Sequence, residues 1–350
     1  MNKKRVTTLK VAATYIGTIV GAGFATGQEI FQFFTKFGMM GLAGLIVSTI
    51  MFIIFGYIIM DLGKKLKANS HLEIIMFSGG KKLGTIIDVI ITIFLFESFT
   101  AMIAGTGAMF AQQFNLSSSI GNTLMAILTA VTVLTGINGV INAISFVVPF
   151  LLAAVIGTSI FSVFNASSYF TATIYNAKGS SLMNNWFLGA ILYASYNIII
   201  SVAVLGPLGA EAKDKKTIKN GAILGGLGLG LGSIMIFLAL WSNLSEIKNL
   251  EVPMIYIASK ISYPAQIAYA IVLTAEVYTT AVGSLYGFVS RITETKKHDI
   301  NNLLIVFITT VAALLASQFG FSNIVTYVYP LIGYGGIILL VSLIVSKFHN

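Results

Sequence analysis

The 350-residue chain contains no cysteine. It therefore cannot form disulfide bonds, use a thiol nucleophile or bind a metal through thiolates. Charged residues are also scarce, at 9% of the chain, whereas soluble domains carry about 25%. Hydrophobic residues make up 56% of the chain, and apolar runs of about 20 residues, long enough to cross a ~30 Å hydrocarbon core, recur along its length. This composition is typical of a polytopic α-helical membrane protein.

Histidine is rare as well. The three histidines, His71, His298 and His349, all lie in or beside polar, lysine-bearing segments, so we expect no histidine proton relay inside the membrane. No nucleophile–base pair or metal-ligand set stands out, and we expect neither enzymatic activity nor a cofactor. The basic N-terminus precedes an apolar run that is too long for a signal peptide, so we expect this run to remain as the first transmembrane segment.

Ten apolar segments can be recognised, and the polar intervals between them are too short for a separate soluble domain. We therefore expect a single transmembrane domain over residues 1–350. The segments cover about 9–37, 40–62, 83–114, 120–138, 141–165, 186–210, 217–242, 264–290, 300–318 and 321–346. A long polar interval after the fifth segment divides the chain into halves of about 9–165 and 186–347.

The distribution of Lys and Arg indicates the orientation, because cytoplasmic loops of membrane proteins are enriched in both. With the N-terminus inside and an even number of spans, seventeen of the 21 Lys and Arg residues fall on the cytoplasmic side. The four that fall outside are Lys36, Lys178, Lys248 and Lys260. We therefore expect a multi-pass protein of the cytoplasmic membrane with both termini in the cytoplasm. The net charge of +9 reflects this orientation and not nucleic-acid binding.

Five spans in each half would place the two halves in opposite orientations, as in inverted-repeat architectures. The predicted fold is therefore an all-α polytopic membrane protein with ten transmembrane helices in a 5+5 inverted repeat. We expect helices 1 and 6 to be broken near the membrane midplane. The break in helix 1 is predicted at Gly21, Ala22 and Gly23, and the break in helix 6 at the polar residues 195–197.

The stretch "GTIVGAGFATGQE", residues 17–29, places four glycines and a charge inside the first apolar segment. Unwinding there would free backbone groups that lipid cannot satisfy but a bound ligand can. The amides from Gly21 to Phe24 would begin a new half-helix whose positive end attracts an anionic group. The alternative is close helix packing through small residues. The following Gln28 and Glu29 could gate the site, pair with another helix or cap the half-helix.

A second glycine-rich stretch, "GGLGLGLGS" in the seventh segment, lacks the strand that precedes a dinucleotide-binding loop. We expect these glycines to serve helix packing.

Two carboxylates lie near the middle of their spans, where a charge costs roughly 2.5–3.5 kcal/mol or more and usually faces a cavity or a pathway. These are Glu97 and Glu276; the alternative for each is a protonated, hydrogen-bonded structural residue. Thr279 and Thr280 follow Glu276 at i+3 and i+4, so two hydroxyls and a carbonyl could bind a small cation. The alternative is that both threonines hydrogen-bond back to their own helix.

Together these residues resemble the amino acid–polyamine–organocation superfamily and its LeuT-type fold, and "GTIVGAGFATGQE" is most similar to the YkvI-like bacterial membrane proteins. The resemblance extends over essentially the whole chain. It implies one sodium ion bound by the carbonyls of Gly17, Val20 and Glu276 and the hydroxyls of Thr279 and Thr280. Glu276 departs from the family pattern, in which a small uncharged residue is expected, and this leaves either sodium or a proton as the coupling ion.

The resemblance also implies a substrate site between the two helix breaks. Gly21, Ala22, Gly23 and Phe24 would face a substrate carboxylate, and Ser195, Tyr196 and Asn197 would form the opposite wall. Glu97 would face a substrate ammonium or act as a proton site.

The function that the resemblance implies is cation-coupled secondary transport of a small amino acid or related zwitterion by alternating access in the lipid bilayer. The other function considered is a ligand-sensing membrane receptor that uses the same site without transport. The first-span Asp-Pro-Gly and sixth-span Met-Pro-His of metal-transporting relatives are missing, so we do not expect a transition-metal substrate. The oligomeric state does not follow from the sequence.

Overall fold

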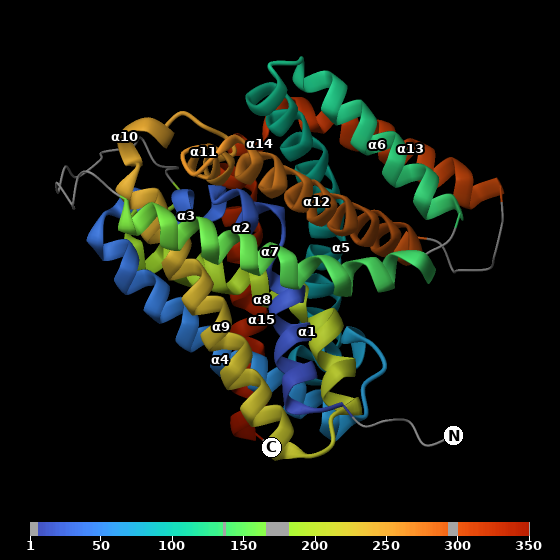
Figure 1. Ribbon diagram of the computed structural model, residues 1–350. Coiled ribbons are helices and arrows are strands. Elements are labelled where there is room, and N and C mark those ends of the chain that lie inside the picture. Colours follow the sequence, from blue (N-terminus) through green and yellow to red (C-terminus); the bar gives the residue numbers. More distant parts are fainter. Residues whose placement is uncertain (1–5, 136–137, 166–181, 293–299, 350) are drawn as a thin grey trace.

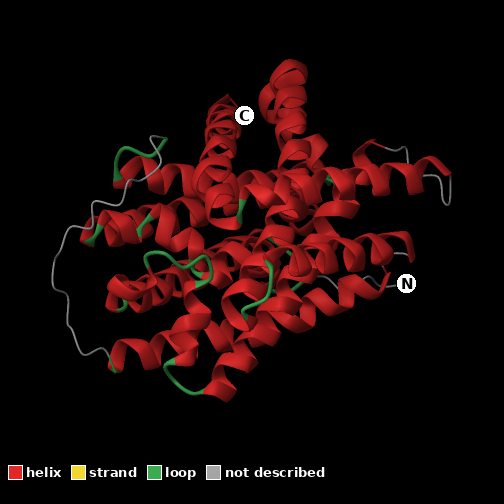
Figure 2. Cartoon of the chain, turned by 90° about the horizontal axis from the view of Figure 1, so that it is seen from above, coloured by secondary structure: helices red, strands yellow, loops and turns green. Residues whose placement is uncertain are grey.

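The computed structural model describes residues 6–135, 138–165, 182–292 and 300–349, and nearly all of them are helical (Figures 1 and 2). The first half contains α1 (Thr8–Ile19), α2 (Ala22–Thr26), α3 (Gln28–Phe33), α4 (Met39–Leu66), α5 (His71–Phe114), α6 (Ser118–Thr135) and α7 (Asn138–Phe164). The second half contains α8 (Trp186–Glu211), α9 (Lys215–Ser242), α10 (Leu244–Ile247), α11 (Pro253–Ser259), α12 (Tyr263–Ile292), α13 (Ile300–Ala316), α14 (Phe321–Asn323) and α15 (Tyr329–His349). A π-helical turn, Ile324–Val328, joins α14 to α15.

Several of these helices are long and apolar enough to cross a membrane. In the described part of the chain there are six such segments: α4, α5, α8, α9, α12 and the segment Phe321–Lys347. Shorter apolar helices cover Ser118–Leu134, Phe150–Phe164 and Leu303–Phe319. The chain is therefore a helical membrane protein. Most of the polar interval predicted between the halves, including Lys178, lies outside the described residues.

The helices form two groups joined by α7 and α15 (Figure 1). In one group α4 packs on α8 and α9, and α1 packs on α9 and α8. In the other group α5, α6, α12 and α13 pack on one another. The helix α7 contacts both α9 and α12, and α15 contacts both α8 and α5. Residues on α1–α3, α5, α8 and α15 therefore meet at the junction between the two groups.

Polar contacts fix the position of α5 relative to α12. In the first half of α5, Asp88 Oδ1 accepts a hydrogen bond of 2.5 Å from Arg291 Nη1, which also donates to Thr92 Oγ1 at 3.1 Å. Nearly three turns after Asp88, Ser284 Oγ of α12 donates to Ser98 Oγ at 2.9 Å. These contacts determine which face of α5 points toward the junction.

The predicted break in the first transmembrane helix is confirmed. The helix α1 ends at Ile19, Val20 is extended, and Gly21 is extended at φ −131° and ψ −168° before α2 begins. A second interruption, which the sequence did not indicate, follows at Gly27, whose left-handed φ of +80° separates α2 from α3.

The predicted break in helix 6 is wrong, because residues 186–211 form one continuous helix, α8. The polar residues at its centre are accommodated without unwinding. Ser195 Oγ donates to Leu192 O at 3.0 Å, and Asn197 Nδ2 donates to Tyr193 O at 2.9 Å. Side chains that hydrogen-bond to carbonyls of the preceding turn leave the helical hydrogen bonds in place, and this stretch carries no glycine that would favour another conformation.

The glycines of α9 serve helix packing, as predicted. A Cβ atom added at Gly221 would collide with Val11 of α1, and one added at Gly225 would lie 2.6 Å from Tyr15 Cδ1. Tyr15 cannot move aside easily, because it is fully buried and its hydroxyl donates to Phe52 O at 2.7 Å. The missing side chains therefore let α1 approach α9 closely.

We predict that Gly225→Ala lowers the thermal unfolding midpoint of the purified protein, because the new methyl group overpacks against Tyr15 and costs about 1–3 kcal/mol. The matched control is Gly157→Ala on α7, where nothing lies within 4 Å of the added methyl group. The control should leave the midpoint unchanged or raise it slightly. An equal midpoint for the two variants would contradict the proposed packing of α1 on α9.

Candidate functional site

The break after α1 leaves backbone carbonyls without helical partners. The last hydrogen bond of α1 runs from Val20 N–H to Ile16 O, and the next one in this segment runs from Ala25 N–H to Gly21 O within α2. The carbonyls from Gly17 to Val20 therefore receive no hydrogen bond from the following turn, as at any helix end. Gly21 is half-buried, and nothing lies within 4 Å of the position that its Cβ would occupy.

The left-handed turn at Gly27 brings Glu29 back onto α2. In a continuous helix, residues 23 and 29 would face different directions, because six residues correspond to about one and two-thirds turns. In the structure the Glu29 carboxylate lies directly against Gly23, where a Cβ atom would collide with it. Glu29 is 6% exposed, and its Oε2 has no hydrogen-bond partner. A carboxyl group of the chain itself thus lies at the break.

A second carboxyl group, from Glu97 at the middle of α5, faces the same region. Glu97 is 6% exposed, and neither of its carboxylate oxygens has a hydrogen-bond partner among the described residues. It interacts electrostatically with Glu29, and no cationic side chain of the described chain contributes to the electrostatic environment of either residue. Burying a carboxylate without a counter-charge lowers the stability of the folded protein. We therefore expect this pair of acidic residues to have a function other than stabilising the fold.

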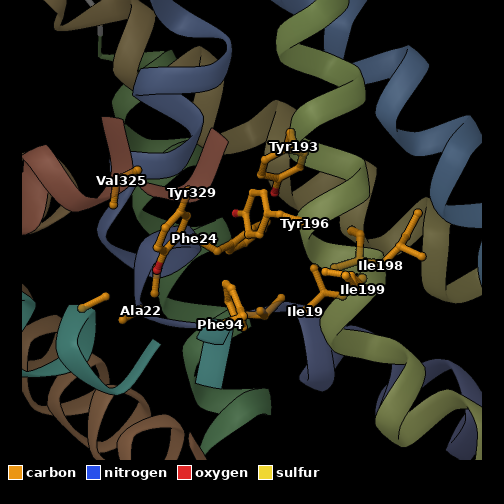
Figure 3. Close-up of a cluster of buried hydrophobic side chains, with 14 of the residues drawn as sticks. Ile19, Ala22, Phe24, Phe94, Tyr193, Tyr196, Ile198, Ile199, Val325 and Tyr329 are labelled. Carbon is orange, nitrogen blue, oxygen red and sulfur yellow. The ribbon is translucent and has the colours of Figure 1, made fainter. Parts of the chain in front are cut away.

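Two tyrosines interact with these carboxyl groups: Tyr196 of α8 with Glu29, and Tyr329 of α15 with both. Figure 3 shows Tyr196, Tyr329, Phe94 of α5 and Phe24 of α2 within one buried cluster. The Tyr196 ring lies 5.0 Å from that of Tyr329 and 6.4 Å from that of Phe94, measured between centroids. The Tyr196 hydroxyl lies beside the Glu29 carboxyl. We call Glu29, Glu97, Tyr196, Tyr329 and Phe94 the acidic–aromatic cluster.

The break separates a closed half of the first segment from an accessible half. Beyond the break, every residue of α2 is buried, and the Tyr269 hydroxyl of α12 donates to Ala25 O at 2.6 Å. Gln28 Nε2 of α3 donates to Ser322 Oγ of α14 at 2.7 Å. Before the break, Thr14, Gly17 and Thr18 on one face of α1 are only half-buried, as is Gly21 in the break itself. The cluster is therefore sealed on the side of α2 and α3.

The structure places Tyr196 alone, of the three residues predicted to form the opposite wall, in the acidic–aromatic cluster. Ser195 contacts α15 instead, where its Oγ donates to Gly333 O at 2.7 Å. Asn197 uses its side-chain amide within α8. Of the residues predicted to face a substrate carboxylate, Gly23 contacts the Glu29 carboxyl, which would repel an anionic group unless Glu29 carried a proton.

The predicted sodium site draws on two elements. Gly17 lies on α1 and Val20 directly follows this helix. The helix α1 packs on α9 and α8, whereas α12 packs on α5, α7 and α2. On α12, Thr279 Oγ1 donates to Glu276 O at 3.0 Å, and Thr280 lies beside the Glu276 side chain. Glu276 Oε2 is buried without a hydrogen-bond partner among the described residues. The three residues on α12 thus lie close to one another.

Sequence reasoning did not assign Phe94 or Tyr329 to the site, and it left three roles open for Glu29. It also missed Tyr193, whose ring centroid lies 5.6 Å from that of Tyr196. Tyr193 precedes Tyr196 by three residues and so shares its face of α8; its hydroxyl is also buried without a well-formed hydrogen bond. This spacing was a usable signal, whereas nothing in the sequence around Phe94 or Tyr329 indicated a site.

Comparison with solved structures identifies the fold. The chain resembles a Na⁺-coupled sialic acid symporter in a substrate-bound outward-open state, with a TM-score of 0.63, 12% identity and coverage of 97% of this chain and 79% of the other. It resembles MhsT in complex with L-phenylalanine with a TM-score of 0.61 at 16% identity, covering 94% and 87%. For the inward-facing conformation of Mhp1 the TM-score is 0.58 at 12% identity, covering 91% and 74%. The chain therefore has the LeuT-type fold of membrane transporters.

Two proteins of Bacillus subtilis (strain 168) are related in sequence over nearly the full length. The membrane protein YkvI is 31% identical over 350 residues, which cover 99% of this chain and 98% of YkvI. The protein YyaD is 31% identical over 329 residues, covering 94% of each. The chain belongs to the YkvI family. No protein-family model matches it.

We predict that Glu97→Gln raises the free energy of unfolding of the ligand-free protein at neutral pH by about 1–3 kcal/mol. The change is measured as a higher thermal unfolding midpoint. In the folded wild type, Glu97 must either be charged without a partner or hold a proton that the unfolded chain would release at this pH. Both cases lower stability, and the substitution removes both.

The control variant is Glu246→Gln, because Glu246 is exposed and forms an ion pair with Lys260, which together with Tyr256 holds the pKa of that carboxyl below its usual range. Removing an exposed ion pair should change stability by less than about 1 kcal/mol. A lower midpoint for Glu97→Gln than for wild type would show that Glu97 is a structural residue.

Proposed function

We propose that this protein is a secondary transporter of a small amino acid or related zwitterion, coupled to sodium or protons. The observation that carries the proposal is the acidic–aromatic cluster, in which two buried carboxyl groups interact, one of them lying at the break in the first segment. Among the described residues, neither oxygen of Glu97 has a hydrogen-bond partner, and Glu29 Oε2 has none. Buried ionisable groups in a membrane protein usually mark a substrate or ion pathway. The LeuT-type fold and the family membership support the same class of function.

In this proposal the substrate binds at the break between α1 and α2. Its ammonium group lies toward Glu97, and the rings of Tyr196, Tyr329 and Phe94 add cation–π attraction. Its carboxylate lies toward the amides of Ala22, Gly23 and Phe24, next to Glu29. A protonated Glu29 would donate a hydrogen bond to this carboxylate, which removes the repulsion that an ionised Glu29 would cause.

The coupling cation would bind where the end of α1 meets α12. Its ligands would be the carbonyls of Gly17 and Val20 together with Glu276, Thr279 and Thr280. Because its ligands come from both helices, the site would be complete only in an arrangement that brings α1 and α12 together, which we call closed. A cation that binds only the closed arrangement shifts the equilibrium toward it, and this links ion binding to substrate binding.

The transport cycle follows from the closed and accessible halves of the first segment. We propose ten transmembrane spans in a 5+5 inverted repeat, with both termini in the cytoplasm of the cell. In this orientation the accessible face of α1 opens to the cytoplasm, and the contacts of Ala25 and Gln28 close the outer side. Rocking of the α4–α8–α9 group against the α5–α12 group would exchange the two states.

The test is uptake of the twenty protein amino acids, one at a time, into proteoliposomes with imposed sodium or proton gradients. We expect at least one of them to accumulate, and Gly23→Ala to reduce its uptake by about tenfold or more, because the added methyl group displaces the Glu29 carboxylate by steric overlap. The matched control is Gly157→Ala on α7, where nothing lies within 4 Å of the added methyl group, and it should leave uptake within about twofold of wild type.

Three outcomes would count against parts of the proposal. No accumulation of any amino acid under either gradient would refute transport of this substrate class. Equal uptake by Gly23→Ala and wild type would exclude the break as the site. The double variant Thr279→Val and Thr280→Val should abolish any sodium dependence, and persistence of that dependence would remove the α12 residues from the cation site.

A further inference from the structure

We propose that Glu97 alternately holds a proton and the ammonium group of the substrate, so that each substrate molecule that binds releases one proton from the site. This inference rests on the proposed function, and it assigns a coupling step to the substrate site itself. It concerns a residue distinct from the α12 carboxyl group near Thr279 and Thr280. It is independent of whether sodium also binds.

The first step of the argument is the surroundings of Glu97. It lies at the middle of α5, and both of its oxygens are buried without a hydrogen-bond partner. Glu29 from α3 and Tyr329 from α15 interact with it electrostatically. On α12, Ser284 is hydrogen-bonded to Ser98, the residue that follows Glu97. None of these groups offers a counter-charge.

The second step is electrostatic. Glu29 and Glu97 are both buried and interact electrostatically. Simultaneous ionisation of two such carboxyl groups is unfavourable without a cation, because each negative charge raises the energy of the other. The isolated charge would also lose its hydration. In the proposed function Glu29 keeps its proton and donates it in a hydrogen bond to the substrate carboxylate, whereas the ammonium group lies toward Glu97. We therefore assign the exchangeable proton to Glu97.

The third step is the exchange. When the ammonium group enters, the O–H bond of the Glu97 carboxylic acid breaks, the electron pair stays on the carboxylate, and the proton leaves to water. The carboxylate then forms a charge-assisted hydrogen bond with an N–H of the ammonium group. Glu97 is uncharged before the exchange and paired with the ammonium group after it. The substrate carboxylate is bound separately, by the amides of α2 and the Glu29 carboxylic acid, and the released proton balances the charge. With this exchange, the buried Glu97 can bind a cationic group and is never ionised without a counter-charge.

The test is the number of protons released on binding, measured by isothermal titration calorimetry of purified protein in phosphate and in Tris buffer. The two buffers have different enthalpies of ionisation, so the difference between the observed binding enthalpies gives the proton count. The probes are the twenty protein amino acids. For wild type, each one that binds should release about one proton per molecule bound.

The variants distinguish Glu97 from its neighbour. Glu97→Gln should weaken binding by about 30-fold or more and release no proton, because an amide neither ionises nor neutralises an ammonium group. Glu97→Asp keeps the carboxyl group and should keep the proton release. Glu29→Gln keeps a hydrogen-bond donor and should also release about one proton. The unfolding midpoint of each variant, measured in parallel, shows that it is folded.

Each other result would overturn the inference. Amino-acid binding with identical enthalpies in the two buffers would leave the proposed transport function intact but exclude proton exchange. Proton release that persists in Glu97→Gln, or that disappears in Glu29→Gln, would assign the proton to another group. If no amino acid binds to the wild type, both the inference and the proposed function fail.

Discussion

The left-handed conformation of Gly27 decides which chemical groups the first transmembrane segment presents at its break. A non-glycine residue would be strained at φ +80°. The turn separates α2 from α3 and folds Glu29 back onto Gly23, which has no side chain to prevent the contact. The region next to the freed carbonyls of α1 therefore contains an acidic group as well as backbone dipoles. The conformation of Gly27 thus determines where Glu29 lies relative to the other residues of the acidic–aromatic cluster.

The surrounding helices determine which side chains lie beside this turn, and the burial of the acidic ones lowers the stability of the folded protein. The helix α5 adds Glu97, and α8 and α15 add tyrosines, so two acidic groups are enclosed mainly by aromatic rings. Burial of carboxyl groups without partners lowers the stability of the folded protein. Elsewhere the helices pack closely, as where the α9 glycines admit Val11 and Tyr15 of α1. Such local losses of stability are characteristic of binding sites, because a ligand can supply the interaction that the protein lacks.

Features of the structure were predictable from the sequence where the signal for them is local, and were missed where they depend on tertiary contacts. Helix positions and the first break were predictable, since apolar run length and clustered glycines have direct local consequences. The break predicted in helix 6 was wrong, because Ser195 and Asn197 can hydrogen-bond to their own helix as readily as they can accompany unwinding. Glu97 was identified as a site candidate from its depth alone. The role of Glu29 could not be predicted, since one turn at Gly27 changes its position relative to the membrane.

The remaining parts of the site depend on long-range packing, which a single sequence does not reveal. Phe94 and Tyr329 are separated by more than two hundred residues, yet their ring centroids lie 6.3 Å apart. The closed side of the first segment likewise depends on distant pairs, such as Gln28 with Ser322 and Tyr269 with Ala25. These contacts give the structure a direction, because the break is accessible from α1 and sealed beyond α2. Because the chain contains no cysteine, a single introduced cysteine can be labelled to test from which side the break is accessible.

The most direct test of the site is chemical labelling of a single cysteine at Gly21, introduced as Gly21→Cys into the otherwise cysteine-free chain. A membrane-impermeant maleimide applied to inside-out membrane vesicles should label this residue. Amino acids that stabilise the purified protein should slow the labelling, because they occupy the break beside Glu97 and Glu29. Labelling that proceeds at the same rate with and without those amino acids would show that they bind elsewhere, and it would contradict the account of the site given above.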